Sequence, residues 1–351
     1  MAAALRVILA GLGVRGRYWA EVINRSERAE IVAYADPNPA ALAKACADFG
    51  ERPVYAGTET AIESVSADAL VLANPPMGRD VQIRAAAARN LPMLIEKPLA
   101  LSVREAAELT ALAGDVPLMV GLNFRYLAVT KAVLELLHTG TVGKPEFARF
   151  TYERWRDGNR ANLNKYPLTM DQPMLWEQSI HHFDLLRYVY GQEPIKVEAQ
   201  TWNPSWSMYA SDSNVAALFS FDKGLVVNYH GLWMGGWSQP GFEWRSDCTG
   251  GVISQRDQFG DLFYARHADT QLTEIPLPPH ELWITETEGL FAAFLSAVID
   301  GAPLQCSARD HIRSLAMVEA CALSSREQQA VEIRRILEEG GALRLLKDHP
   351  V

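Results

Sequence analysis

The stretch that decides the fold is LRVILAGLGVRG, residues 5–16. It begins as a short apolar run, which is typical of a buried β-strand, and ends in GLGVRG, a complete G-x-G-x-x-G pattern. Residues 17–25 then carry Trp19, Val22 and Ile23 at helical spacing. A strand that turns through glycines into a helix leaves backbone N–H groups and the positive end of the helix dipole free to bind phosphate.

An aspartate after the next apolar stretch makes this pattern more specific. Residues 29–35, AEIVAYA, are typical of a second buried strand, and Asp36 follows them 20 residues beyond Gly16. A carboxylate here accepts hydrogen bonds from both ribose hydroxyls of an adenosine and repels a 2′-phosphate. The sequence therefore predicts a dinucleotide site that prefers NAD to NADP. The alternatives are a glycine turn without a ligand and an aspartate that caps the following helix.

Composition limits the class of protein. The chain has 351 residues, a formal net charge of −9 and 48% hydrophobic residues, which predicts two globular domains. The acidic balance argues against nucleic-acid binding, and no apolar run reaches the roughly 18–20 residues that span a bilayer. We interpret residues 1–10 as leading into the first strand rather than as a signal peptide. The cysteines lack metal-binding spacing, which indicates reduced thiols in a cytoplasmic protein; they are Cys46, Cys248, Cys306 and Cys321.

The first third of the chain alternates between strand and helix patterns. Helices are expected at 17–25, 39–49, 58–65, 80–90 and 102–114, and further strands at 68–76, 91–98 and 117–123. This alternation predicts a doubly wound parallel sheet, a Rossmann domain, over residues 1–124. Ligands of such sheets bind at the carboxyl ends of the strands. The predicted cofactor-binding residues lie there: Gly11, Leu12, Gly13, Val14, Arg15, Gly16, Asp36, Asn74, Pro75, Glu96, Lys97 and Asn123.

The pattern changes after about residue 125. A helix over 125–138 is followed by alternating segments at 144–156, 195–202, 214–221, 224–233 and 241–248, which indicate antiparallel strands. Eight of the nine tryptophans lie between Trp155 and Trp283. We predict a second domain over residues 125–351, in which an antiparallel sheet makes both a ligand pocket and an interface. Helices expected at 285–300 and 308–326 would lie back across the domain boundary.

Two later stretches carry candidate chemistry. In Glu96-Lys97-Pro98, a lysine at a strand end is suited to hydrogen bonding or proton exchange with a substrate hydroxyl, although a solvated Glu–Lys pair is the commoner case. Glu96 would orient this lysine or contact the nicotinamide ribose.

The second stretch is WEQSIHHFD, residues 176–184. Glu177, His181 and Asp184 are spaced to share one helix face, and a carboxylate one turn from a histidine favours a general base near neutral pH. The alternatives are a core histidine with a structural carboxylate and a metal site, for which the chain shows no complementary cluster. His182 points to another face and is expected to be structural.

With these stretches the chain resembles the Gfo/Idh/MocA oxidoreductases over essentially its whole length. The resemblance is carried in order by residues 11–16, Asn74-Pro75, Glu96-Lys97-Pro98, GLNFRY at 121–126, TGTVGKP at 139–145 and the D-x-G-x-H-x-x-D pattern at 177–184. It implies a Rossmann domain followed by an α+β domain with an open, mostly antiparallel sheet that binds substrate. It also implies NAD(P) as cofactor, dimers or tetramers through the second sheet, and oxidation of one secondary hydroxyl of a sugar or cyclitol. It further implies that Lys97 is the catalytic lysine, His181 the proton acceptor and Glu177 the carboxylate beside them.

Three residues depart from the family pattern. Glu177 replaces the commoner Asp and is one methylene longer. Ser179 replaces the usual Gly and would tighten the pocket. Arg79 stands where a His is frequent, so we expect a cofactor or salt-bridge contact there rather than catalysis.

The resulting hypothesis is hydride transfer from a carbinol to nicotinamide. His181 would take the proton, Lys97 would bind the reacting oxygen, and Glu177 would orient His181 or bind a neighbouring hydroxyl. The substrate pocket would be lined by aromatic and polar side chains, namely Trp155, Arg156, Tyr166 and Trp176. A loop at 157–172 beside this pocket would act as a specificity lid. The alternatives are a redox-neutral sugar-modifying enzyme with retained NAD and a non-enzymatic NAD-dependent sensor.

Overall fold

The computed structural model describes residues 4–161 and 163–346, which form two compact units. The first contains residues 4–123, 281–312 and 340–346. The second contains Phe124–His280, apart from residue 162, together with Arg313–Glu339. The helix α8 (Thr285–Asp300) therefore belongs to the first unit, although it follows the second in sequence.

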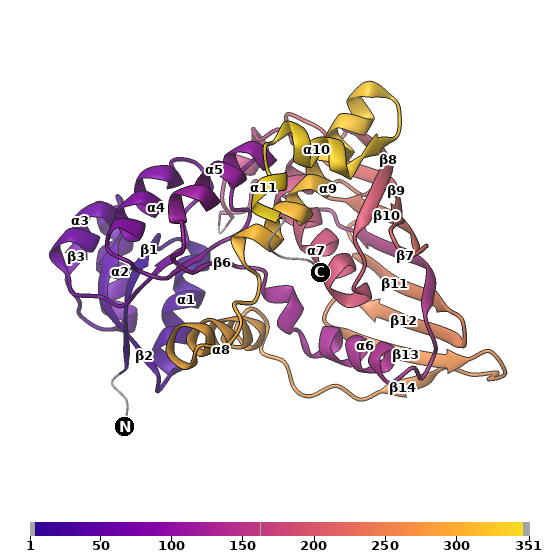
Figure 1. The fold of residues 1–351 in the computed structure, drawn as a ribbon, viewed down its shortest axis with the longest axis horizontal. Coiled ribbons are helices and arrows are strands. Elements are labelled where there is room, and N and C mark those ends of the chain that lie inside the picture. The colour runs from indigo at the N-terminus through magenta and orange to yellow at the C-terminus, as the bar shows by residue number, and fades with distance from the viewer. Residues whose placement is uncertain (1–3, 162, 347–351) are drawn as a thin grey trace. The chain divides into compact units, whose positions relative to one another are not determined.

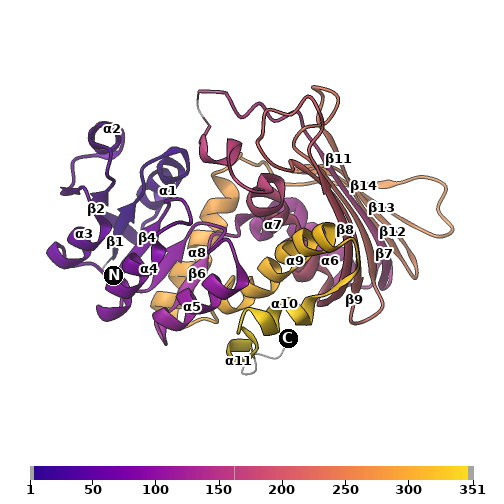
Figure 2. The same ribbon diagram turned by 90° about the horizontal axis from the view of Figure 1, so that it is seen from above.

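The first unit is built on a six-stranded parallel sheet in the order β3-β2-β1-β4-β5-β6. Its central strands are buried along almost their whole length because both faces are covered by helices. Helix α1 packs with α2 and α8, while α4 packs with α3 and α5 (Figures 1 and 2). The bounds are β1 (Leu5–Ala10), β2 (Ala29–Ala35), β3 (Val54–Tyr55), β4 (Ala69–Leu72), β5 (Met93–Ile95), β6 (Leu118–Val120), α1 (Val14–Arg25), α2 (Pro39–Phe49), α3 (Thr58–Ser64), α4 (Arg79–Ala88) and α5 (Val103–Ala113).

This sheet confirms the predicted Rossmann fold. The strand order reverses between β1 and β4, and such a switch point is where these sheets bind ligands. The later strands are shorter than expected, since their carboxyl ends leave the sheet as loops. Asn123 is an example: instead of ending a strand it begins the short helix η1 (Asn123–Tyr126), and the next helix, α6 (Ala128–His138), starts three residues later than predicted.

The second unit contains a nine-stranded sheet in the order β14-β13-β12-β11-β7-β10-β9-β8-β15. Its paired strands are antiparallel except for β7 and β10, which confirms the mostly antiparallel sheet. The sequence did not predict the strands β12, β13, β14 and β15. The bounds are β7 (Pro145–Glu153), β8 (Pro194–Trp202), β9 (Asn214–Phe221), β10 (Val226–Leu232), β11 (Gly241–Cys248), β12 (Gly251–Asp257), β13 (Gly260–Arg266), β14 (Thr273–Ile275) and β15 (Val331–Glu332).

Alternation along these strands decides which face is covered. Phe150 and Tyr152 of β7 are buried, whereas Phe147 and Arg149 of the same strand are exposed. Figure 2 shows α6, α7 (Ile180–Tyr190) and α9 (Ala308–Glu327) against one side of the sheet, and the other side without helices. The helix α10 (Ile333–Glu339) follows the edge strand β15. Within the part of the chain that the structure describes, no helix is long and apolar enough to cross a membrane.

The sequence predicted one continuous helix from residue 176, and this is wrong in one respect. A π-helix, η3 (Leu175–Ser179), precedes α7. The wider π turn breaks the α-helical phase between the two segments, so Glu177 is not positioned by the simple i, i+4, i+7 rule. A single-turn π segment within a helix is frequent at functional sites.

Candidate active site

The glycine turn of the first unit leaves no room for side chains at its first and third glycines. A Cβ on Gly16 would lie 1.8 Å from the carbonyl oxygen of Gly11, and one on Gly11 would lie 2.7 Å from the amide nitrogen of Asn74. Gly11 also has φ +84°, which favours glycine. A Cβ on Gly13 would meet no described atom within 4 Å, so the turn is open only there. This shape fits a pyrophosphate at the start of α1.

Asp36 is fixed against this turn. One carboxylate oxygen accepts a hydrogen bond from the amide of Leu12 at 2.6 Å, and the other accepts one from the amide of Asn38 at 2.8 Å. The side chain that caps α2 is Asn38, which accepts from the amide of Ala40 at 3.0 Å. Asp36 therefore belongs structurally to the glycine turn rather than to the cap of α2.

Glu96 joins the start of α1 to the end of β5. Its Oε1 accepts hydrogen bonds from Nε of Arg15 at 2.6 Å and from the indole Nε1 of Trp19 at 2.8 Å. A Cβ on Gly121 would lie 3.1 Å from the same oxygen. The terminal nitrogens of Arg15 are buried and have no hydrogen-bond partner among the described residues. Because a buried donor without a partner is costly, these atoms fit an incoming anionic group such as a dinucleotide phosphate.

Lys97 lies directly after Glu96 and is partly buried. The loop that carries it is held by Arg79, whose side chain is 1% exposed. The guanidinium donates to the carbonyls of Pro98 at 2.5 Å and Leu99 at 3.1 Å, and to the carbonyl of Asn74 at 2.7 Å. Arg79 thus connects the loops after β4 and β5, a structural role that sequence reasoning missed.

The remaining predicted cofactor residues lie at the same strand ends. Asn74 donates to Oε1 of Gln82 at 2.8 Å, and its own Oδ1 is buried without a hydrogen-bond partner among the described residues. Asn123 is buried and donates to Oε1 of Glu286 on α8 at 3.3 Å. Pro75 is exposed.

In the second unit, His181 is the second residue of α7 and is 7% exposed. Its ring stacks on Phe124, with ring centroids 4.2 Å apart and an interplanar angle of 20°. Four residues before it, Glu177 accepts a hydrogen bond from the hydroxyl of Tyr166 at 2.6 Å. Sequence reasoning identifies Phe124 only as part of a motif, because its contact with His181 joins positions 57 residues apart in the sequence.

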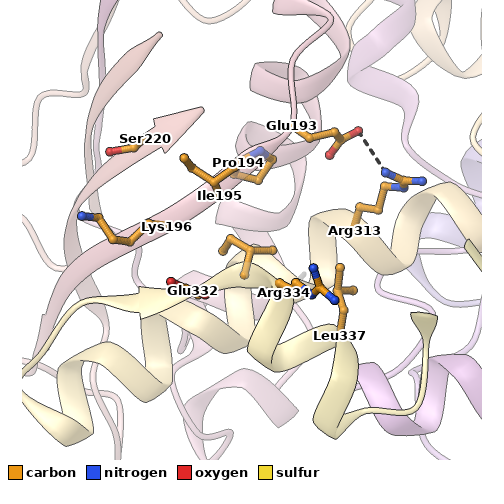
Figure 3. A pocket seen from close by; sticks show the side chains of 10 residues that line it. Glu193, Pro194, Ile195, Lys196, Ser220, Arg313, Glu332, Arg334 and Leu337 are labelled. Atoms are coloured by element: carbon orange, nitrogen blue, oxygen red, sulfur yellow. Dashed lines mark ion pairs between the residues drawn. The ribbon is translucent and has the colours of Figure 1, made fainter. Parts of the chain in front are cut away.

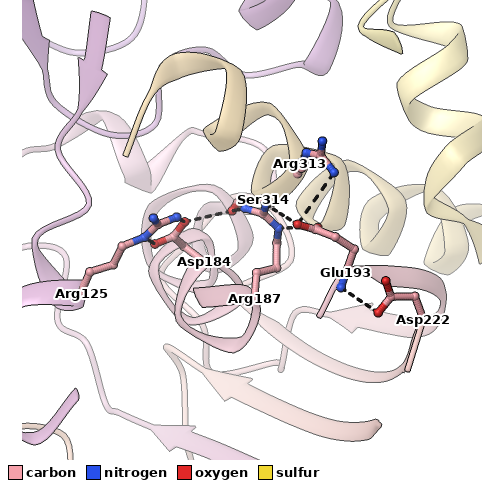
Figure 4. Close-up of polar contacts among 7 residues, drawn as sticks. All are labelled: Arg125, Asp184, Arg187, Glu193, Asp222, Arg313 and Ser314. Carbon is pink, nitrogen blue, oxygen red and sulfur yellow. Dashed lines mark hydrogen bonds and ion pairs between the residues drawn. The ribbon is translucent and has the colours of Figure 1, made fainter. Parts of the chain in front are cut away.

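Asp184 has a different function from the one suggested by its spacing. Arg125 binds it through two nitrogens, at 2.6 and 2.5 Å, and the hydroxyl of Ser314 donates to it at 3.1 Å. This buried pair is part of a chain of polar contacts that continues through Arg187 to Glu193 (Figure 4). The described residues contain no group of three side chains that could hold a metal ion. Asp184 is therefore a structural carboxylate that fastens η1, and with it Phe124, to α7.

His182 and Ser179 lie in the core of the second unit. His182 shares hydrogen bonds with Tyr229 at 2.8 Å and Gln178 at 3.0 Å. Burial, and secondarily the charge of Arg154, lowers the pKa of His182 to about 3, so the ring is neutral, as expected for a structural residue. Ser179 is fully buried and accepts from Tyr229 at 2.8 Å. The expectation that Ser179 tightens the pocket is therefore not supported by its position in the core.

The predicted substrate-lining residues are only partly gathered. The guanidinium of Arg156 lies 4.3 Å from the ring centre of Trp233, another residue that the sequence did not single out. Trp155 is 39% exposed and pairs through its backbone with Met234, whereas Trp176 is buried. The loop at 157–172, of which residue 162 lies outside the described residues, is anchored at several points on the segment around Tyr209.

A separate cavity of about 550 Å³ lies in the second unit between β8, β15 and α10 (Figure 3). Glu193, at one end of the polar chain in Figure 4, lines it together with Arg313, which lies 3.9 Å from Glu193. The residues that line this cavity include none of the predicted site residues.

Three features define a dinucleotide-binding protein: the glycine turn at residues 11–16, here called the glycine cradle, the carboxylate of Asp36 at the end of β2, and the buried Arg15 nitrogens. Comparison with known families identifies it further: residues 5–124 match the Gfo/Idh/MocA oxidoreductase family with an NAD-binding Rossmann fold, and residues 130–253 match the C-terminal domain of the same family. The chain belongs to the Gfo/Idh/MocA family of oxidoreductases.

Several relatives are similar over nearly the full chain. The chain is 23% identical to D-apiose dehydrogenase of Paraburkholderia graminis, covering 95% of this chain and 91% of the relative. It is 24% identical to inositol 2-dehydrogenase of Rhizobium meliloti, covering 94% and 99%. Among solved structures, an oxidoreductase from Agrobacterium radiobacter in complex with NAD+, L-tartaric acid and magnesium has a TM-score of 0.87 at 19% identity, covering 95% of this chain and 100% of that chain.

Proposed function

We propose that this protein is an NAD-dependent dehydrogenase that oxidises a secondary hydroxyl of a sugar, sugar derivative or cyclitol, or catalyses the reverse reduction. The observation that carries the proposal is the position of Glu96 and Lys97. Glu96 is bound to Arg15 at the start of α1, beside a glycine turn that fits pyrophosphate, and this supports a role for the adjacent Lys97 at the edge of the proposed cofactor site. The names of relatives, which include apiose, inositol and anhydrofructose enzymes, support the substrate class.

The proposed chemistry gives each candidate residue its own role. When bound, NAD supplies the hydride acceptor. His181 accepts the hydroxyl proton at an imidazole nitrogen, and its stacking on Phe124 fixes the plane of the ring. Lys97 hydrogen-bonds the same oxygen and stabilises developing negative charge, while Glu177 orients His181 or binds a neighbouring hydroxyl. Arg79 keeps the Lys97 loop in place through three carbonyls.

The preference for NAD over NADP is a further part of the proposal. Asp36 is fixed by two backbone amides at the end of β2, so its negative charge cannot readily move away from a 2′-phosphate. Titration of the protein with NAD and NADP tests this preference. Tighter binding of NADP would contradict it.

We also propose that a second copy of this chain covers the sheet face that carries no helices, giving a homodimer or homotetramer. Phe147 and Leu218 are 39% and 48% exposed on this face, where Arg149 and Glu243 also pair. Light scattering of the wild type and of the Leu218→Glu variant tests the assembly. A cytoplasmic location belongs to the same proposal and is supported by four cysteines that are thiols in the structure.

The activity is tested with a panel of monosaccharides, cyclitols and glycosides, including D-apiose and myo-inositol, by NADH formation at 340 nm. The expected result is turnover of at least one compound with free exchange of NAD and NADH. The nucleotide content of the purified protein should be measured in parallel. Tightly retained NAD with product formed but no NADH released would indicate a redox-neutral enzyme, and binding without any turnover would indicate a sensor.

A further inference from the structure

The proposed catalytic carboxylate is hydrogen-bonded to a loop tyrosine in this structure. Tyr166 lies in the 3-10 turn η2 (Tyr166–Leu168), and Glu177 lies in the π-helix η3. Their oxygens are 2.6 Å apart, with the phenol donating to Oε1 of Glu177. This is the length of a charge-assisted hydrogen bond between a hydroxyl and a carboxylate, the stronger class of hydrogen bond in proteins.

The turn that carries Tyr166 is itself held in place. The side chain of Lys165 donates to the carbonyls of Gly158 and Arg160, which closes the loop on itself. The amide of Ala210 donates to the carbonyl of Leu168 at 2.9 Å, which ties the turn to the segment before β9. Tyr166 is therefore presented by an anchored turn and gives Glu177 a fixed partner.

The length of Glu177 matches this partner. An aspartate at the same position would withdraw the carboxylate by about 1.5 Å, one carbon–carbon bond, and the 2.6 Å contact with Tyr166 would be lost. The π turn gives Glu177 a different direction from that of an uninterrupted helix. Both features, the longer side chain and the π turn, bear on the position of the same carboxylate.

We infer that Tyr166 is a positioning residue that holds Glu177 for the reaction, rather than a residue that lines the substrate pocket. This inference rests on the proposed function, because it assigns Glu177 to the dehydrogenase site. Tyr166 would act on the rate through the direction of one carboxylate. It would have little effect on which sugar or cyclitol is chosen or on the binding of NAD.

The test is a double-mutant cycle with Tyr166→Phe and Glu177→Asp. Each single change breaks the same hydrogen bond, so we expect each to lower kcat roughly 10- to 100-fold, with little change in KM. The double variant should be no slower than Glu177→Asp alone. Glu177→Gln keeps the side-chain length and an oxygen that accepts the hydrogen bond from Tyr166, but removes the charge. Adding Tyr166→Phe to Glu177→Gln should therefore lower kcat further, which separates loss of the hydrogen bond from loss of the charge.

Tyr209→Phe is the matched control. Its hydroxyl donates to the carbonyl of Arg156 at 3.0 Å and fastens the same loop without contacting Glu177. Its effect on kcat should add to that of Glu177→Asp, whereas the effect of Tyr166→Phe should not. Additive effects of Tyr166→Phe and Glu177→Asp, or a Tyr166→Phe variant that changes the ranking of substrates and keeps kcat, would overturn the inference.

Unfolding by denaturant supplies a readout that does not need activity. The losses in unfolding midpoint caused by Tyr166→Phe and Glu177→Asp should likewise fail to add. If the wild type turns over no compound in the panel, the proposed function fails, and this cycle still decides whether Tyr166 holds Glu177. Full additivity of the midpoints would then reject the pair itself.

Discussion

Replacing Asp184 with Asn should lower the free energy of unfolding of the second unit by more than the loss of one exposed charge would. Asp184 is 1% exposed and Arg125 is 7% exposed, so both charges are buried and balance each other. The isosteric amide keeps the volume but leaves the guanidinium of Arg125 without its counter-charge. Breaking a buried pair in this way costs about 3–5 kcal/mol. In a unit of this size, that loss lowers Tm by about 6–20 °C.

Tryptophan fluorescence during chemical denaturation is a suitable assay, since all tryptophans except Trp19 and Trp283 belong to the second unit. Ser314→Ala, which removes one neutral donor from Asp184, should cost only about 1 kcal/mol. The double variant Arg125→Met/Asp184→Leu should recover most of the loss, because it removes both buried charges. A loss below about 1 kcal/mol for Asp184→Asn would refute the reasoning.

Four further substitutions test other parts of the structure. Gly16→Ala should disrupt the glycine turn and lower the unfolding midpoint, because its Cβ would lie 1.8 Å from the Gly11 carbonyl oxygen. Gly13→Ala should keep the wild-type unfolding midpoint and lose NAD binding. Equal midpoints for the two variants would contradict this packing argument. Arg79→Ala should lower the free energy of unfolding by about 2–4 kcal/mol and reduce kcat, because the loop that carries Lys97 loses its hydrogen bonds to Arg79. An unchanged kcat would show that Arg79 does not position Lys97. The pKa of His182 is about 3 in the folded protein, against an ordinary histidine value of 6.5, so the unfolded chain binds the extra proton and the free energy of unfolding should fall as pH decreases from about 6.5 toward 3. His182→Gln should flatten this pH dependence. An unchanged pH slope in this variant would contradict the reasoning.

The Rossmann half could be predicted because its signals are local. The glycine pattern, the apolar strands and Asp36 lie within 32 residues of one another, and each has a conformational or electrostatic consequence that the sequence alone reveals. The helices expected from residues 39 and 102 also begin through short-range contacts, since the side chains of Asn38 and Ser102 accept hydrogen bonds from backbone amides in the first turns of α2 and α5. Element ends were less predictable, because the carboxyl-end loops are held by contacts such as those of Arg79.

The second unit was harder to predict because its contacts join distant residues. Phe124 meets His181, Arg125 meets Asp184 and Arg156 meets Trp233, and no short motif encodes these pairs. The π turn before α7 also escaped prediction, since helical spacing does not distinguish it from an α-helix. As a result, candidate residues, Tyr166 among them, could be chosen from the sequence, whereas the contacts that orient these residues could not.

The most direct test of the proposed dehydrogenase is steady-state NADH formation by His181→Ala on the best substrate of the panel, together with NAD binding by calorimetry. Removing the proposed base should lower kcat by roughly 10²–10⁴-fold. The dissociation constant of NAD should not change, because the glycine cradle, Asp36 and Arg15 remain intact. A His181→Ala enzyme with the kcat of the wild type would contradict the central claim that His181 takes the proton.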